Sequence, residues 1–274
     1  MATQLDSRRH VFRPDLADIS LKGRVEAARY VDGRPMQVCV PVLDLLAKPD
    51  AGALASQVLY GEVFDVFDVS DGLAWGQNRT DGYVGYVIES GLSAVCEANR
   101  TITSKLTHVY PEPNFKTSPT SQLTYMSRVL VDGEAGEFYS VADGFISKRH
   151  FDHKPTSFVE EATRFVGIPY LWGGRSMLGL DCSALVQLAL MAVGVSCPRD
   201  SDMQLAELGA EVDDSYQSGD LLFWKGHVGI MFDDTTLLHA NVNHMAVAFE
   251  PIVEAIARIK KTDGPVLAQK RLSI

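Results

Sequence analysis

The spacing of apolar residues changes at Pro155, and this change constrains the fold more than any other feature of the chain. From Met36 to Val95, apolar residues come in short runs separated by Pro, Asp and Gly, a pattern typical of β-strands: 38–42, 58–69, 73–77 and 83–88. After Pro155, helical and strand patterns follow one another. The 274 residues are enough for two or three domains, so we expect all-β domains followed by a mixed one.

Residues 1–35 are expected to form an N-terminal leader that carries a short helix. The helical pattern runs over 18–31, and Asp18 is a candidate N-cap because its carboxylate can accept hydrogen bonds from the first helical N–H groups. We interpret residues 36–95 as a first small β-barrel.

A weak internal repeat predicts a second copy of that barrel. Residues 56–60 (SQVLY) are echoed by 121–125 (SQLTY), and residues 81–84 (DGYV) by 143–146 (DGFI). The two offsets, 65 and 62 residues, agree closely, as two copies of one fold would require. We therefore assign a second small β-barrel to residues 96–154.

Residues 155–274 are predicted to form an α+β domain in which helices are followed by an antiparallel sheet. Ser157 begins a capping box before a helix over 158–166, and Gly194 ends a helix that begins at Cys182. A third helix is expected over 201–208, and strands over 221–224, 227–232, 237–240 and 246–249.

The acidic balance of the chain argues against two classes of partner. A net charge of -10 and a pI near 5.1 leave no basic stripe to meet nucleic-acid phosphates or an acidic membrane surface. No apolar run approaches the roughly 20 residues needed to span a bilayer. The pair Arg8-Arg9 is followed by a charged stretch, unlike a twin-arginine signal, so we expect an unexported, cytoplasmic protein. The oligomeric state is left open.

The four cysteines lie without a CxxC pair or the spacing of metal ligands: Cys39, Cys96, Cys182 and Cys197. We expect no disulfide, no metal and no cofactor. Cys182 differs from the others because it begins an apolar helix, where unpaired N–H groups and the helix dipole favour a thiolate. His227 and His239 follow on short strands, so a thiol, a base and a third polar group indicate nucleophilic catalysis.

Five motifs of the third region occur in a fixed order that chance would rarely produce: 169–174 (PYLWGG), 181–183 (DCS), 198–204 (PRDSDMQ), 219–223 (GDLLF) and 226–230 (GHVGI). With these motifs the region resembles the NlpC/P60 cysteine peptidases. The two β-repeats resemble the bacterial SH3-like (SH3b) domains that often precede this catalytic domain. The resemblance implies a papain-like NlpC/P60 catalytic domain preceded by two small all-β SH3-like barrels.

Members of this family hydrolyse cell-wall peptides, commonly at the bond between γ-D-glutamate and a diamino acid. The domain order resembles members that act on murein stem peptides with a free N-terminal L-alanine, in which the neighbouring β-domain closes one end of the cleft. The resemblance thus implies an L-alanyl-γ-D-glutamyl-diamino-acid endopeptidase that acts in cell-wall peptide recycling. Which diamino acid it accepts is left open.

The resemblance implies three catalytic residues. Cys182 would be the nucleophile, and His227 the general base that takes the thiol proton and later protonates the leaving amine. His239 would accept a hydrogen bond from His227 and so fix the tautomer and ring plane of the base. Asn241 and His244 are nearby rivals for this third position. The backbone N–H of Cys182 would bind the oxyanion.

Four further residues are expected to bind substrate or support the site: Tyr170, Asp181, Ser183 and Tyr83. The hydroxyl of Tyr170 would lie against the nucleophile, whereas Asp181 and Ser183 would contribute to binding of the free ammonium. Asp181 can also cap the helix, but its charge would oppose ionisation of the thiol unless it points away or meets a cation. Tyr83 aligns with an aromatic residue that reaches the cleft in similar enzymes, and a surface tyrosine of the barrel is the alternative.

Other residues near these motifs are interpreted as structural. Trp172 is expected in the core. Glu62 is expected in a solvated loop, and its alternative role is to supply a second carboxylate for the substrate ammonium. Arg199, Gln204 and Asp220 belong to the family motifs, where we expect an architectural role.

Two other classes of function stay open. The papain-like fold serves several acyl-transfer chemistries, so one alternative is an amidase or acyltransferase that acts on another amide or ester. The other is a non-catalytic wall-binding protein that works through its SH3-like domains, and the complete set of Cys182, His227 and His239 argues against it. The peptidase hypothesis predicts that N-acetylation of the substrate abolishes turnover.

Overall fold

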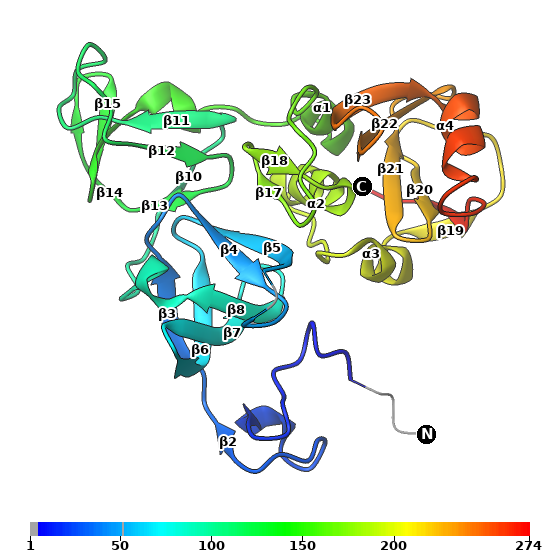
Figure 1. The fold of residues 1–274 in the computed structure, drawn as a ribbon. Helices are drawn as coiled ribbons and strands as arrows, with labels where there is room; N and C mark the ends of the chain where they lie inside the picture. Colours follow the sequence, from blue (N-terminus) through cyan, green and yellow to red (C-terminus); the bar gives the residue numbers. More distant parts are fainter. Residues whose placement is uncertain (1–4, 51) are drawn as a thin grey trace. The chain divides into compact units, whose positions relative to one another are not determined.

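The structure is a computed structural model that describes residues 5–50 and 52–274 (Figure 1). The chain divides into two compact units, which we call unit 1 (residues 1–153) and unit 2 (residues 154–274), and each is described by itself. The finer domain boundaries given above, after residues 35, 95 and 154, stay predictions.

The leader is not helical over 18–31, so this prediction is wrong. Two short parallel strands, β1 (Ala17–Asp18) and β2 (Tyr30–Val31), are joined by a segment with one 3-10 turn, η1 (Ile19–Leu21). Asp18 caps that turn as expected, since its carboxylate accepts the N–H of Ser20 at 2.7 Å. Gly23 then adopts a φ of 83°, a left-handed conformation that ends helices.

The leader contributes to the core of unit 1. Val11 and Leu16 are buried in one apolar cluster with Trp75 of the first β-region. The guanidinium carbon of Arg13 lies 4.2 Å from the ring centroid of Trp75, and Arg13 forms an ion pair with Asp68 at 2.6 Å. Because helix propensity is a weak preference, such contacts override it.

The first β-region of unit 1 forms one seven-stranded sheet in the order β5-β4-β8-β7-β6-β3-β9, with antiparallel neighbours. Its elements are β3 (Arg34–Val38), β4 (Val42–Leu46), β5 (Leu54–Leu59), β6 (Val63–Ser70), β7 (Leu73–Asn78), β8 (Val84–Ile88), the 3-10 turn η2 (Glu89–Gly91) and β9 (Leu92–Ser93). The run predicted at 58–69 is two strands, because the chain turns at Gly61, whose φ is 79°. The run predicted at 38–42 is the link between β3 and β4.

The second β-region pairs in smaller groups: β10 with β13, β11 with β12, and β14-β15-β16. Its elements are β10 (Arg100–Thr101), β11 (Leu106–Val109), β12 (Ser121–Thr124), β13 (Arg128–Val129), β14 (Val131–Ala135), β15 (Phe138–Val141), β16 (Gly144–Ser147) and the 3-10 turn η3 (Lys148–Phe151). Both copies of the sequence repeat take equivalent places. Residues 56–60 and 121–125 include the second strand of a hairpin, and Gly82 and Gly144, both with positive φ, lie at the turns into β8 and β16. This equivalence supports two copies of one fold.

Gly61 marks the contact between the two β-regions of unit 1. The carbonyl of the preceding Tyr60 accepts the N–H of Arg128 at 2.8 Å, and the Tyr60 hydroxyl donates to Asp143 at 2.8 Å. A Cβ added to Gly61 would lie 1.9 Å from the carbonyl oxygen of Arg128. The close approach of the two backbones therefore requires glycine at this position.

Unit 2 contains the mixed α+β region. Its elements are α1 (Phe158–Thr163), β17 (Arg175–Ser176), β18 (Gly179–Leu180), α2 (Cys182–Ala192), α3 (Ser201–Glu207), β19 (Ala210–Val212), β20 (Leu221–Trp224), β21 (His227–Met231), β22 (Thr236–Asn241), β23 (Ala246–Pro251), α4 (Ile252–Ile259) and β24 (Ala268–Arg271). The three predicted helices and four predicted strands are present, with ends shifted by up to three residues. Helix α4 and the strands β17, β18, β19 and β24 were not predicted.

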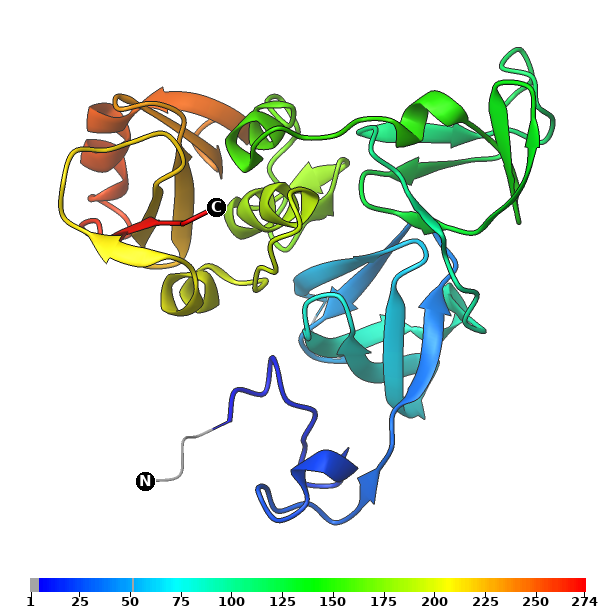
Figure 2. The same cartoon turned by 180° about the vertical axis from the view of Figure 1, so that it is seen from behind.

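The six-stranded antiparallel sheet of unit 2 has the order β19-β24-β20-β21-β22-β23. Helices α2 and α4 lie on opposite sides of it (Figures 1 and 2). Met231 and Leu237 pack against Ile252 and Ile259 of α4. Alternate residues of a strand share one face of the sheet, so His239 lies on the same face as Leu237. Helix α4 covers this face. Helix α2 is apolar on most of its circumference, apart from Ser183 and Gln187, in keeping with the burial of nine of its 11 residues.

Three side chains differ from their expected burial. Trp172, expected in the core, is 69% exposed. Glu62, expected in a solvated loop, is buried, and its carboxylate accepts the N–H of Leu59 at 2.9 Å. Tyr83 is buried in unit 1, so the surface-tyrosine alternative is wrong. Among the described residues, the longest helix has 11 residues, and none is long and apolar enough to cross a bilayer.

Candidate active site

Cys182 is the first residue of α2, and its neighbours hold it there. The carboxylate of Asp181 caps the helix by accepting the N–H of Ala184 at 2.8 Å, which confirms the capping prediction. The thiol is 7% exposed, and Sγ lies 4.0 Å from the carbonyl oxygen of Gly226, the residue before His227. The structure thus brings the thiol of α2 to the start of β21.

Asp181 is the centre of a buried hydrogen-bond network. Its carboxylate accepts five hydrogen bonds, from the N–H groups of Gly173 and Ala184, the hydroxyl of Ser183 and two nitrogens of Arg199. Nη2 of Arg199 lies 2.7 Å from Oδ2 of Asp181, and the Arg199 side chain is 1% exposed. Arg199 also donates to the Ser183 hydroxyl at 2.9 Å. Of the two possibilities left open for Asp181, the structure shows that it meets a cation, Arg199.

The expectation of a thiolate at rest is wrong. Burial, and next the charge of Asp181, raise the pKa of the Cys182 thiol to about 12. The N–H groups of Val228 and Ser183 and the charge of Arg199 oppose this rise without cancelling it. A helix N-terminus favours a thiolate only where water or a cation reaches the sulfur, and here desolvation is the larger effect.

His227 and His239 form the second half of the site. Nε2 of His227 lies 2.9 Å from Nδ1 of His239, which is completely buried on β22. The two predicted rivals are paired with each other, since Asn241 accepts the backbone N–H of His244 at 2.9 Å and lies 3.0 Å from its ring. Of the candidates for the third position, His239 is the one in contact with His227.

Both histidine rings are neutral at ordinary pH. Burial lowers the pKa of His227 to about 4, and burial together with His227 lowers the pKa of His239 to about 3. With the thiol also protonated, the resting site holds a neutral thiol and a neutral imidazole rather than an ion pair.

Glu250 and Arg258 extend the chain of contacts, and the sequence reasoning missed both. Oε2 of Glu250 lies 3.0 Å from Nε2 of His239, and Arg258 donates to both carboxylate oxygens, at 3.0 and 2.5 Å. The sequence signals were an acidic residue directly after the strand predicted at 246–249 and an arginine eight positions later. Neither motif spacing nor periodicity links them to His239.

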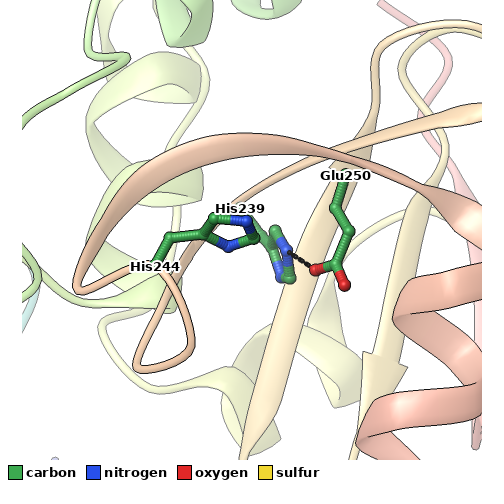
Figure 3. A group of neighbouring side chains, drawn as sticks. All are labelled: His239, His244 and Glu250. Carbon is green, nitrogen blue, oxygen red and sulfur yellow. Dashed lines mark hydrogen bonds and ion pairs between the residues drawn. The ribbon is translucent and has the colours of Figure 1, made fainter.

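His239, His244 and Glu250 could each offer one ligand atom to a metal ion, and these atoms lie within 4.8 Å of one another (Figure 3). Both ring nitrogens of His239 already have protein partners, and Arg258 already contacts both oxygens of Glu250. A metal ion would have to displace these partners, so the present contacts fit a hydrogen-bond chain better than a metal centre, and we derive no step through a metal.

Tyr170 is partly buried, and the contact of its hydroxyl with the nucleophile stays a prediction. Its backbone N–H donates to Met245 at 2.9 Å, and burial together with Cys182 and Asp181 raises the pKa of its phenol, so the phenol stays protonated. Tyr83 belongs to unit 1, and its contact with substrate stays a prediction.

The remaining motif residues have structural contacts. Gln204 donates to the carbonyls of Ser183 and Pro198, both at 2.9 Å, and so fixes the first turn of α2. Asp220 accepts hydrogen bonds from Gln269 and Arg271 of β24 and joins that strand to the start of β20. These contacts support the architectural role expected for Gln204 and Asp220.

A thiol at a helix start and a histidine pair on the adjoining antiparallel sheet define a cysteine hydrolase of papain-like architecture. Residues 167–262 match the NlpC/P60 family, and residues 45–92 match the bacterial dipeptidyl-peptidase Sh3 domain. The chain is thus a cysteine peptidase with an NlpC/P60 domain and an N-terminal bacterial SH3 domain.

Individual relatives agree with this assignment. The chain is 27% identical over 239 residues to a Dipeptidyl-peptidase 6 of Lysinibacillus sphaericus, a match that covers 75% of this chain and 87% of that protein. It is 36% identical over 107 residues to a Gamma-D-glutamyl-L-lysine dipeptidyl-peptidase of Bacillus subtilis, covering 36% of each chain. A crystal structure of an NlpC/P60 family protein from Bacillus cereus shares the fold, with a TM-score of 0.69 and 18% identity over 87% of this chain and 99% of that one.

Proposed function

We propose that this protein is a cysteine endopeptidase that hydrolyses murein peptides at the bond between γ-D-glutamate and a diamino acid. One observation carries the proposal: the thiol of Cys182 lies beside the residue before His227, and His227 and His239 are 2.9 Å apart. Relatives named Gamma-D-glutamyl-L-lysine dipeptidyl-peptidase support the choice of bond and substrate class.

In the proposed reaction, the thiol of Cys182 gives its proton to Nδ1 of His227 while the sulfur attacks the γ-carbonyl carbon of D-glutamate. The backbone N–H of Cys182, at the start of α2, is the candidate to stabilise the oxyanion. The imidazolium of His227 then protonates the leaving amine of the diamino acid, and a thioester remains on Cys182. Water, deprotonated by His227, hydrolyses the thioester and restores the thiol.

We further propose that the substrate needs a free N-terminal L-alanine, with Asp181, Ser183 and Tyr83 near its ammonium group. Because the Asp181 carboxylate already accepts five hydrogen bonds, an ammonium would have to replace one of these donors. A role in recycling murein peptides in the cytoplasm is a further part of the proposal, and it follows from the family resemblance alone.

The test is mass spectrometry of the purified protein incubated with L-Ala-γ-D-Glu-meso-diaminopimelate and with its N-acetylated form, beside a Cys182→Ala variant. We expect the wild type alone to release L-Ala-D-Glu and diaminopimelate. Acetylation should slow this at least about a hundredfold, since a site built to hydrogen-bond a substrate amine rejects an analogue that cannot make those bonds.

Each alternative has its own outcome in this test. Equal rates on both peptides would contradict the amine requirement while leaving the peptidase intact. Release of ammonia or another acyl product in place of the diamino acid would favour the amidase or acyltransferase. Absence of any Cys182-dependent product, with retention of the protein on cell-wall material, would favour the wall-binding protein.

A further inference from the structure

We propose that Glu250 sets the tautomers of both active-site histidines, and that Arg258 holds the Glu250 carboxylate in the orientation that does so. Glu250 is then a positioning residue that acts on the thiol through two imidazole rings. The inference rests on the proposed function, because it explains how His227 presents the correct nitrogen to Cys182.

The geometry is a continuous chain of contacts from Arg258 on α4 to the ring of His227. Arg258 of α4 reaches Glu250 of β23, Glu250 reaches Nε2 of His239 on β22, and Nδ1 of His239 reaches Nε2 of His227 on β21. Figure 3 shows the ring of His239 beside the Glu250 carboxylate, with the bond between them dashed. The strand register explains this contact, since His239 pairs with Ala248 and Glu250 is its diagonal neighbour.

Proton positions along the chain follow from what each group can donate. The pKa of Glu250 is lowered by Arg258, so its ionised carboxylate only accepts hydrogen bonds. The ring of His239 must therefore carry its single proton on Nε2, which leaves Nδ1 bare. A bare Nδ1 accepts, so His227 must donate from Nε2, and its own Nδ1 is left without a proton.

This result matters for catalysis because Nδ1 is the only ring nitrogen of His227 that is free to take the thiol proton. In the opposite tautomer, with His239 donating from Nδ1, His227 would hold its proton on Nδ1 and could not act as a base. In the serine-protease triad, an acidic group sets the tautomer of the base directly. Here the acidic group lies one residue further away, behind a neutral histidine.

Arg258 has a separate part in the arrangement. An unpaired carboxylate beside His239 would favour the protonated form of its ring, an imidazolium that donates from both nitrogens. His227 would then have to accept at Nε2 and carry its own proton on Nδ1. The positive charge of His239 would also lie beside the imidazolium that His227 forms during the reaction. Two hydrogen bonds from Arg258 neutralise Glu250 while leaving its Oε2 able to accept from His239. The pair therefore orients His239 without charging it.

The first experiment measures the tautomers in the wild type, by NMR of the protein labelled with 15N-histidine. The 15N signals of an imidazole distinguish a protonated from a bare nitrogen. We expect protons on Nε2 of both His227 and His239 at neutral pH. A proton on Nδ1 of either ring would overturn the proposal, whether or not the peptide is cleaved.

The second experiment compares three variants on the tripeptide. Glu250→Met removes the acceptor and leaves Arg258 free to donate to Nε2 of His239, which reverses both tautomers. We expect kcat to fall at least about a hundredfold, toward the roughly 10⁴-fold loss of a triad held in the wrong tautomer, with KM little changed. The double variant Glu250→Met/Arg258→Met removes the reversing donor and should recover at least about tenfold of the lost kcat. Glu254→Met, an exposed position in the first turn of α4, is the matched control and should keep wild-type kcat.

A purely structural role for the ion pair predicts a different pattern. In that case Glu250→Met would lower the thermal midpoint without reversing the 15N pattern, and the second substitution would not raise kcat. That pattern would overturn the proposal. If the single variant does not fold, the proposal is still tested by the wild-type tautomers and by the double variant. The double variant replaces an ion pair with two apolar side chains, a change that proteins often tolerate. Failure of the proposed function is recognised separately, as absence of cleavage by a wild type with the expected tautomers.

Discussion

The two units of the chain place their charges differently. In unit 1 the ion pairs are partly exposed. The side chains of Arg13 and Asp68, for example, are 21% and 24% exposed. In unit 2 the pair beside the thiol is almost completely buried, since the side chains of Arg199 and Asp181 are 1% and 12% exposed, whereas a pair further from the thiol, Arg271–Asp214, is 27% and 51% exposed. Buried pairs gain little net stability, because desolvation offsets the attraction, but they fix geometry closely. The buried pair of Arg199 and Asp181 holds the first turn of α2 in position, whereas Arg13 and Asp68 of unit 1 fasten the leader to the first β-region.

The largest expected contrast is in catalysis. His227→Ala should lower the rate of tripeptide cleavage by about 10²–10⁴-fold, since it removes the general base. His108→Ala, a partly buried histidine of unit 1, should leave the rate within about twofold. Steady-state rates of diamino acid release measure both. Similar losses in the two variants would mean that the chemistry does not belong to unit 2 alone.

The next contrast is in stability. Arg199→Met leaves the buried Asp181 without its cation, and we expect a loss of about 3–5 kcal/mol in the free energy of unfolding. Arg13→Met removes a partly exposed ion pair and a contact with Trp75, worth about 1–2 kcal/mol together. Urea unfolding of both variants gives the comparison. An equal loss would show that burial of the charge is not what separates the units.

Acidification should affect unit 2 first. His227 and His239 have folded pKa values lowered to about 4 and about 3, below the ordinary 6.5, so the unfolded chain binds more protons between these limits. Their contribution to the free energy of unfolding is complete above pH 6.5 and is lost as the pH falls toward 4. For His227 this loss is on the order of 3 kcal/mol. In unit 1, the pKa of the partly buried His150 is also lowered by burial. Between pH 7 and 4.5, the protection of amides from exchange, corrected for the intrinsic exchange rate at each pH, should therefore fall more in β22 than in β6.

The smallest contrast lies within unit 1. Gly61 and Gly23 both have φ near 80°, so alanine strains the backbone at either position by about 1–2 kcal/mol. A Cβ at Gly61 also meets the carbonyl of Arg128, whereas one at Gly23 has nothing within 4 Å. Gly61→Ala should therefore cost about 1–3 kcal/mol more than Gly23→Ala in thermal unfolding. Equal costs would mean that the two β-regions separate easily at this contact.

Local patterns predicted much of unit 2 because its elements agree with their own sequences. Helix α2 begins at the capping Asp181 and ends before Gly194, whose φ is 81°, and β20 spans the predicted residues. The leader helix failed because packing of Val11 and Leu16 on Trp75 decided its path, and those contacts are distant in sequence.

The site was predicted in part for the same reason. Cys182, His227 and His239 belong to recognisable motifs, and the structure brings them to one end of the sheet. The raised pKa of the thiol depends on burial by many residues, which no local pattern records. Glu250 and Arg258 meet His239 only through the register of β22 with β23 and the position of α4, so only the folded chain identifies them.

The neutral, buried thiol has a consequence for oxidative stress. Peroxide attacks thiolates far faster than thiols, and it attacks exposed sulfur before buried sulfur. Cys182 is protected on both counts, whereas Cys39 and Cys96 are exposed. We therefore expect peroxide to oxidise Cys39 and Cys96 of unit 1 before it oxidises Cys182.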